Sequence, residues 1–189
     1  MATNQNNMAA VTGVESLELA VMAANGAMPT TGWVNVRDIE MGSVNLTIPP
    51  LNKTRVRVED KAGVRWVIPG ETDPATIAFN SLELKIDAAN LLFKGEVTTD
   101  ATEFKAPADS EQIYYLAVRL TSKPFEGKKM VFTAPALAGS AGFVNAITKN
   151  GFLALSYNAD VTTPVDATGN AVSPWGYKFV DATPALPEG

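Results

Sequence analysis

The pentapeptide from Ala138 to Gly142, AGSAG, is the segment of the chain that most resembles a catalytic motif. It is similar to a degraded nucleophile elbow, in which a sharp strand-to-helix turn exposes a reactive serine, here Ser140. The chain has no histidine, so Ser140 lacks the imidazole base that activates such a nucleophile. We therefore interpret the segment as a loop of small residues where the backbone passes close to another group.

Two pairs of carboxylates, Asp160 with Asp166 and Glu59 with Asp60, have the residue types for acid–base chemistry or calcium binding. Neither pair has the ligand spacing of an EF-hand. Glu59 and Asp60 are adjacent on an expected strand, so their side chains point to opposite faces. The pattern favours solvated acids at turns and strand ends.

The densest basic feature is a stripe formed by Lys53, Arg55 and Arg57, with Lys61 and Arg65 close by in the chain. Alternation along a strand places the three stripe residues on one face. A nucleic-acid-binding face is one interpretation, although no aromatic residue interleaves the stripe. A solvated face and an ion-pair surface toward another molecule are the alternatives.

Three tryptophans, Trp33, Trp66 and Trp175, are the candidates for a sugar-stacking platform like that of a carbohydrate-binding module. Buried or interface aromatics are the more common use of this residue type. The sequence alone leaves both interpretations open.

Composition excludes most enzyme classes. The 189 residues are 46% hydrophobic and 19% charged, and they include neither cysteine nor histidine. Without these residues there is no thiol nucleophile, disulfide, iron–sulfur cluster or Cys/His zinc site. Catalysis would have to use carboxylates, lysine, tyrosine or a carboxylate-bound metal. We therefore expect no catalytic, cofactor-binding or metal-binding residues and predict that the protein is not an enzyme.

The charge balance and the N-terminus indicate where the protein acts. Fifteen basic and twenty acidic side chains give a net charge of −5, which is unfavourable for wrapping nucleic acid. The polar N-terminus lacks the basic and apolar regions of a signal peptide. No apolar run approaches the roughly 20 residues of a membrane helix. We expect synthesis in the cytoplasm and no membrane partner.

The length predicts one domain, over residues 13–180, between a flexible N-terminal arm (1–12) and a C-terminal tail (181–189). Alternating apolar residues predict strands through most of the domain. For residues 12–21, a helix with a capping pattern from Thr12 to Glu15 competes with a strand. The expected strands are Leu17–Val21, Val34–Val36, Val44–Ile48, the hairpin Arg55–Ile68, Thr76–Phe79, Leu82–Ile86, a short one near Phe104, Ile113–Thr121, Lys129–Thr133, Gly151–Thr162 and Trp175–Val180.

One helix is expected over Asp87–Lys94, with Asp87 as its cap, Gly95 ending it, and Leu91 or Leu92 in the core. Residues 137–150 are expected to form a loop and residues 166–170 a turn. Many short strands with glycine and proline turns and a single helix predict a mainly β fold, an antiparallel β-sandwich or half-barrel.

The order of these features resembles the tail tube protein, or major tail protein, of long-tailed bacteriophages, a fold shared with the tubes of contractile injection systems. The resemblance begins in Trp33–Ile48, WVNVRDIEMGSVNLTI, where DIEMGS links two strands. It continues through the charged hairpin Arg55–Ile68 and the helix Asp87–Lys94, and it ends with the long strand after Lys149. It covers most of residues 14–180 and consists of fold-level cues.

The resemblance implies a structural virion subunit with no catalytic residues. It implies rings of usually six copies, stacked into a hollow tube through which DNA passes without specific binding. It also implies tape-measure and tail-terminator or tip proteins as partners, and a location in the phage tail. An acidic lumen would repel phosphate, which agrees with passage of DNA. Another virion structural protein, such as a decoration or tail-completion protein, and a carbohydrate-binding adhesin module are the alternatives.

Within such a tube, we expect the stripe Lys53, Arg55 and Arg57 to face another subunit. The expected acidic partners are Glu15, Glu18, Glu40 or Glu71. Val56 and Val58, on the opposite face of the strand, are expected to point into the core.

Overall fold

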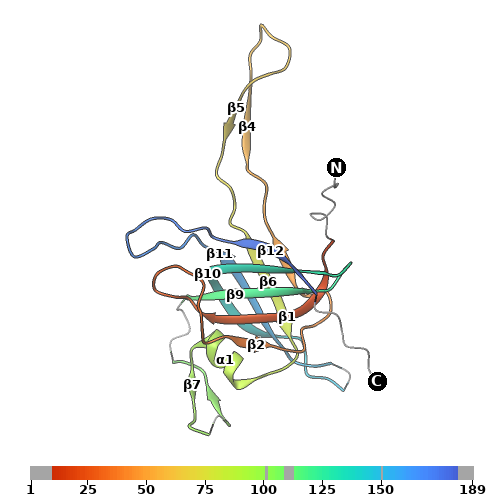
Figure 1. Ribbon diagram of the computed structural model, residues 1–189, viewed down its shortest axis with the longest axis vertical. Helices are drawn as coiled ribbons and strands as arrows, with labels where there is room; N and C mark the ends of the chain where they lie inside the picture. Colours follow the sequence, from red (N-terminus) through yellow and green to blue (C-terminus); the bar gives the residue numbers. More distant parts are fainter. Residues whose placement is uncertain (1–9, 101, 109–112, 150, 183–189) are drawn as a thin grey trace.

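The computed structural model describes residues 10–100, 102–108, 113–149 and 151–182. Within these ranges, eight strands form one antiparallel sheet (Figure 1) in the order β2-β1-β9-β10-β11-β6-β3, with β12 pairing with β10. These strands are β1 (Thr12–Val21), β2 (Val34–Val36), β3 (Asn45–Thr47), β6 (Thr76–Ser81), β9 (Tyr114–Lys123), β10 (Lys128–Val144), β11 (Ala154–Val161) and β12 (Gly176–Asp181). The predicted mainly β, antiparallel fold with one short helix is confirmed.

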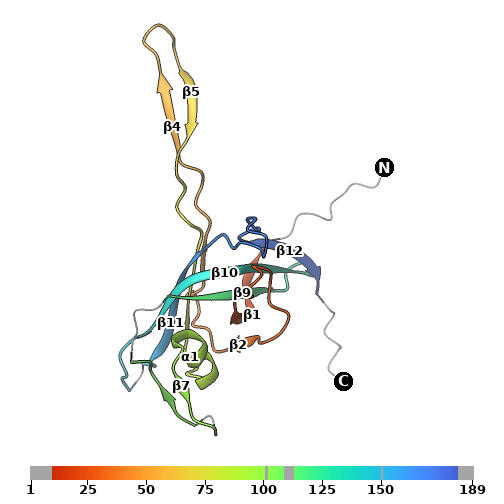
Figure 2. The same cartoon turned by 90° about the vertical axis from the view of Figure 1, so that its left-hand side faces the viewer.

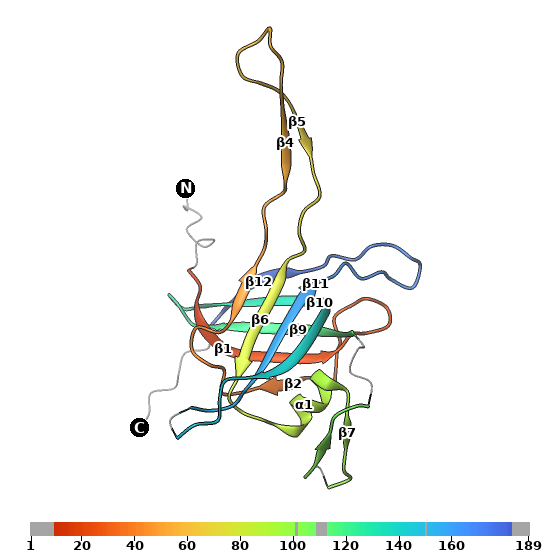
Figure 3. The same cartoon turned by 180° about the vertical axis from the view of Figure 1, so that it is seen from behind.

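Strand β10 joins the two halves of the sheet because it changes partner along its length. Residues 128–133 pair with β12, whereas residues 137–144 pair with β11. At this change the register against β9 shifts between Ala134 and Leu137. Pro135 lies in the resulting bulge, where a residue without an N–H group is tolerated and the strand can bend. Figure 3 shows the outcome, with β6 and β11 running obliquely across β9 and β1.

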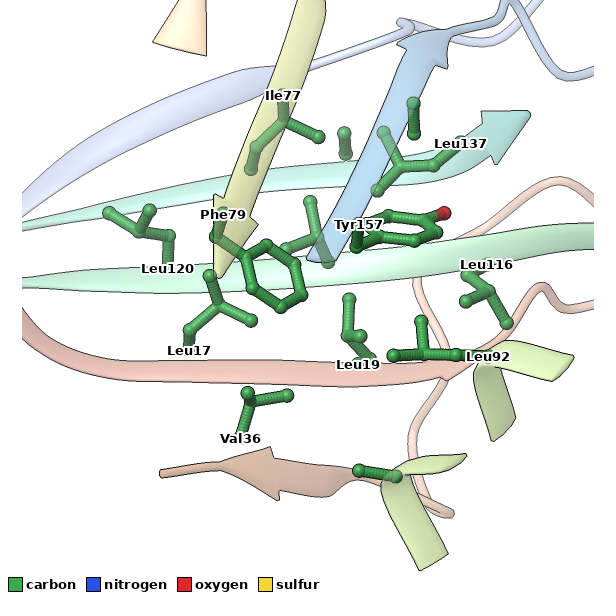
Figure 4. Packing of buried hydrophobic residues seen from close by; sticks show 14 of the residues in the cluster. Leu17, Leu19, Val36, Ile77, Phe79, Leu92, Leu116, Leu120, Leu137 and Tyr157 are labelled. Carbon is green, nitrogen blue, oxygen red and sulfur yellow. The ribbon is translucent and has the colours of Figure 1, made fainter. Parts of the chain in front are cut away.

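The core lies between these two halves of the sheet. Leu17 and Leu19 of β1 point toward Phe79 of β6 and Tyr157 of β11 (Figure 4), and all four side chains are buried. Alternation explains the pattern, since residues two apart on a strand share one face. The other large, fully buried apolar side chains are Phe132, Ile77, Leu116, Leu137, Leu155 and Val118.

The helix α1 (Ile86–Phe93) covers one end of the core, and Leu92 is buried as predicted. Leu91 is half-buried and packs against the core from the outside. The predicted caps are wrong. Lys85 is the N-cap residue and donates no side-chain bond, and Lys94 adopts the left-handed conformation (φ 47°) that ends the helix. Gly95 is needed for another reason, because a side chain there would collide with Lys105 and Phe104.

The strand expected at Leu17–Val21 is confirmed, since residues 12–21 form β1 and the competing helix is excluded. Two other sequence-based expectations are wrong. Leu82–Ile86 is not a strand, because Ile86 already belongs to α1. The loop expected over residues 137–150 contains a regular ladder as far as Val144, where β10 pairs with β11. The predicted turn at residues 166–170 is confirmed, because the Asp166 N–H donates to the carbonyl of Asn170 and the Gly169 N–H donates to the carbonyl of Asp166.

The two predicted arms lie largely outside the described residues, namely at 1–9 and 183–189. At their inner ends, Thr12 begins β1 and Asp181 ends β12, so both residues belong to the sheet.

Two small ladders complete the fold. These are β7 (Glu96–Val97) with β8 (Phe104–Lys105), and β4 (Lys53–Arg57) with β5 (Val64–Pro69).

Candidate functional site

The hairpin β4–β5 projects far from the body of the molecule (Figures 1 and 2), and we call residues 51–70 the arm. The predicted hairpin is therefore present. Every residue of the arm is exposed except Val56 and Val58, which are half-buried. At its base, the amide of Asn52 donates to the carbonyl of Glu71 (2.7 Å), and the Gly70 N–H donates to the carbonyl of Asn52 (2.8 Å). These bonds close the arm where it leaves the body.

The register of the arm gives it two different faces. Lys53 lies opposite Pro69 and Arg55 opposite Val67, so the basic stripe shares its face with these residues. On the other face, Val56 lies opposite Trp66 and Thr54 opposite Ile68. Residues directly opposite one another on an antiparallel pair share a face. The arm therefore presents a cationic face and an apolar face.

The expectation that Val56 and Val58 point into the core is wrong, because the arm stands clear of the core on both faces (Figure 2). Alternation correctly separates the two sets of side chains, but the face opposite the stripe is solvent-exposed. Trp66 on that face is 53% exposed, with the guanidinium of Arg65 5.2 Å from the centre of its ring. A register shift beside Arg57 lets Arg65 lie next to this ring.

Charge is distributed unevenly between the arm and the body. The arm carries five basic and two acidic residues, a net charge of +3. The rest of the chain carries ten basic and eighteen acidic residues, a net charge of −8. Opposite net charges steer two such surfaces toward each other when they belong to different molecules.

The predicted acidic partners of the stripe are mostly engaged within the chain. Glu15 accepts from Lys129 (2.7 Å) and Glu18 from Arg119 (2.6 Å). Glu40 accepts from the side-chain amide of Asn80 (2.8 Å), and Glu71 lies at the base of the arm itself. Glu15 and Glu18 thus already have cationic partners in their own sheet, which makes them poor partners for another copy's arm.

The segment around Ser140 lies within strand β10, where Ser140 pairs with Asn158 of β11. The predicted close approach of the backbone is present, although in a strand. A Cβ atom on Gly139 would lie 2.5 Å from Cζ and from the hydroxyl oxygen of Tyr157. Burial raises the pKa of Tyr157, so this phenol stays neutral. Gly139 therefore makes room for a core tyrosine.

The candidate carboxylates are spread over the arm, strand β11 and the turn at residues 166–170. Among the described residues, no three acidic side chains gather closely enough to hold a metal ion. Glu59 and Asp60 are both exposed near the tip of the arm. Asp166 is occupied by its own turn, because its Oδ1 accepts from the Thr168 hydroxyl (2.7 Å) and from the N–H groups of Thr168 and Asn170.

These hydrogen bonds, above all that from the Thr168 hydroxyl, lower the pKa of Asp166 from 3.8 to about 2. Because the folded pKa is depressed, the contribution of this turn to stability is present above pH ~4. It is lost as the pH falls toward 2. An NMR titration should give a midpoint near 2 for Asp166, and Thr168→Val should move the midpoint toward 3.8. A midpoint of 3.8 in the unchanged protein would contradict this account of the turn.

The three tryptophans lie in different parts of the structure and form no common platform. Trp33 packs against the guanidinium of Arg119 at 4.6 Å, and Trp175 stacks on Phe132 with ring centres 6.2 Å apart. Trp66 lies on the arm. The apolar face around Trp66 was missed by sequence reasoning, because an exposed apolar face has the same alternating pattern as a buried one.

Among the residues that the structure describes, no helix has the length and apolar character required to cross a bilayer. A comparison with protein-family models finds no match to this sequence, and a comparison with curated proteins finds none either.

Proposed function

We propose that the protein is a structural subunit of a bacteriophage tail tube, which self-assembles into stacked rings, hexameric by family resemblance, around a conduit for DNA. The observation that carries this proposal is the arm, which offers two exposed faces away from the core. A two-stranded hairpin alone is only marginally stable in water. Contact with another subunit would cover the apolar face around Trp66 and order the arm.

The chemistry of the arm favours another copy of the same chain as its partner. A cationic surface binds an acidic one favourably, and the body of every copy carries a net charge of −8. An exposed apolar patch beside the charges would be covered in the same contact. In this assembly the protein has no catalytic role and no cofactor. The tape-measure and tail-terminator or tip proteins are the further partners, and the virion is its location.

The test reverses the charge of the stripe with Arg55→Glu and Arg57→Glu in one chain. We expect the monomer to remain folded, because both side chains are exposed, and tube or ring formation to be lost. Raising the salt from 0.15 to 1 M shortens the screening length from about 8 to about 3 Å and should partly mimic the defect. Negative-stain microscopy and sedimentation velocity measure the assembly.

The matched control is Arg37→Glu with Lys178→Glu, which changes the net charge equally at two exposed positions on the body. This variant should assemble as the unchanged protein does. If the unchanged protein stays monodisperse at high concentration, or if the stripe variant assembles normally, the proposed function is wrong.

A further inference from the structure

The core has an open end, where a groove of about 550 Å³ lies between the start of β1 and the β2–β3 connection. Leu120, a buried core residue, lines this groove. Five further lining side chains are half-buried and pack against the core from outside, namely Val14, Ile39, Val44, Leu46 and Met130. Exposed apolar surface gathered in this way marks a binding site. An apolar side chain placed in the groove would extend the existing core.

One lysine supplies positive charge at the edge of the groove. Lys123, the last residue of β9, lines the groove and is exposed. In the described part of the chain, no carboxylate lies within 4.0 Å of its Nζ. The acid that lines the groove, Glu40, is engaged by the side-chain amide of Asn80. The two other lysines at this end of the sheet also have acidic partners, Lys128 with Asp181 and Lys129 with Glu15.

The chain leaves β12 beside the same groove. The Ala182 N–H donates to the carbonyl of Gly127 (2.8 Å), in the turn between β9 and β10. Lys123 and Met130 flank this turn, and both line the groove. Because neighbouring strands lie about 4.8 Å apart, crossing β10 and β9 takes about 10 Å. The seven residues 183–189 can span up to about 23 Å, so they are long enough to enter the groove.

The composition of residues 183–189, TPALPEG, matches the groove. Leu186 offers a large aliphatic side chain to the apolar lining. Pro184 and Pro187 have no N–H group, so burying this stretch leaves fewer donors without a partner. Glu188 is the only charged residue of the seven, and its sign is opposite to that of Lys123.

We propose that residues 183–189 dock in the groove of their own chain, with Leu186 against the apolar lining and Glu188 beside Lys123. The segment is tethered at Ala182, which gives it a high effective concentration at its own groove. Dilute chains therefore fill their own grooves and not those of other copies. This inference concerns a single chain and does not depend on the tail-tube assignment.

Residues 1–9 are the competing occupant, because they precede Val11, which also lines the groove. Residues 3–7 are Thr, Asn, Gln, Asn and Asn. Burying hydroxyl and amide groups in an apolar groove without partners costs free energy. Residues 1–9 also contain no acid that could pair with Lys123. Both the apolar lining and the charge therefore favour residues 183–189.

Intramolecular crosslinking tests the docking, because the chain has no cysteine and introduced thiols are the only ones present. The double variant Ala185→Cys/Met41→Cys places one thiol beside Leu186 and one at the groove, where Met41 is 99% exposed. Dilute protein, kept monodisperse as judged by sedimentation velocity, is treated with a short bis-maleimide. Intact-mass spectrometry should find the mass of one chain with one linker, both of whose ends have reacted.

The matched control is Ala185→Cys/Val165→Cys. Val165 is exposed and lines a small cavity with Met22, which follows the end of β1 opposite the groove. The ten residues of β1 separate the two positions by about 33 Å. This variant should yield chains carrying two linkers, each attached at one end, and no intramolecular crosslink.

Substitutions in the Ala185→Cys/Met41→Cys background test the named contacts. Leu186→Asp should reduce the yield of intramolecular crosslink to that of the control pair. Lys123→Glu should lower the yield, and adding Glu188→Lys to it should restore the yield, because the exchange re-creates the pair of opposite charges. A yield that none of these changes alters would show that docking does not involve these side chains and would overturn the inference.

Three further results would overturn it. These are equal yields from the Met41 and Val165 pairs, a product of twice the chain mass in place of the intramolecular one, and a crosslink in Ala2→Cys/Met41→Cys but not in Ala185→Cys/Met41→Cys. The last result would assign the groove to residues 1–9. Because every measurement uses dispersed chains, failure of this inference leaves the proposed function standing. Failure to form tubes or rings likewise leaves this inference standing.

Discussion

Replacing Leu92 with alanine is expected to lower the free energy of unfolding by about 2–5 kcal/mol. Leu92 is 4% exposed and points from α1 toward β1 in Figure 4, within the cluster that contains Leu19 and Leu116. Alanine is the best helix former, so the substitution should not weaken α1 itself. The loss would come from the missing contacts and the cavity that remains. Urea unfolding followed by circular dichroism measures it.

The matched control is Leu84→Ala, just before α1, where the leucine is exposed. A substitution at such a position should change the stability by less than about 0.5 kcal/mol. If Leu92→Ala and Leu84→Ala lower the free energy of unfolding equally, α1 does not cover the core with Leu92.

Gly139→Ala is expected to destabilise the protein by about 1–3 kcal/mol, the usual cost of overpacking a core. The new methyl group would lie 2.5 Å from the ring of Tyr157 and 2.6 Å from Cβ of Ala159. Neither neighbour can yield easily, since Tyr157 is fully buried and Ala159 has no flexible side chain. Thermal unfolding of the variant beside the unchanged protein measures the effect.

Gly142→Ala is the control, three residues further along the same strand. No atom lies within 4 Å of the Cβ position there, and the backbone is not in the left-handed region. Since glycine within a strand costs about 0.5–1 kcal/mol relative to alanine, this variant should be as stable as the unchanged protein or slightly more so. A loss of stability equal to that of Gly139→Ala would contradict the close approach to Tyr157.

The same two glycines explain why the sequence predicted a loop over residues 137–150. Glycine and alanine carry no strand signal of their own, and local propensity gives no information about a tyrosine from another strand. The position of Tyr157, which requires Gly139, depends on the ladder between β10 and β11. Sequence reasoning therefore found the need for a small residue but not the element that contains it.

The arm illustrates the limit of alternation as a signal. Alternation correctly predicted the hairpin and placed Lys53, Arg55 and Arg57 on one face. It could not show that the opposite face, with Val56, also lacks a cover, because burial depends on what packs against a strand. The exposed Ile147 and Phe152, between β10 and β11, were missed for a related reason, since they lie in a glycine-containing segment with no hydrophobic period.

The pairing of β1 has a consequence for how each copy is made. Leu17 of β1 pairs on one side with Val36 of β2 and on the other with Leu120 of β9. The first partner follows closely in the chain, but Glu18 and its ion-pair partner Arg119 are 101 residues apart. At about 5–20 residues per second, a ribosome needs roughly 5–20 s to reach β9 after β1. Through that interval β1 lacks its longer native partner, so Leu17 and Leu19 cannot yet be buried as they are in the finished sheet, and folding of this part of the core must follow synthesis of β9.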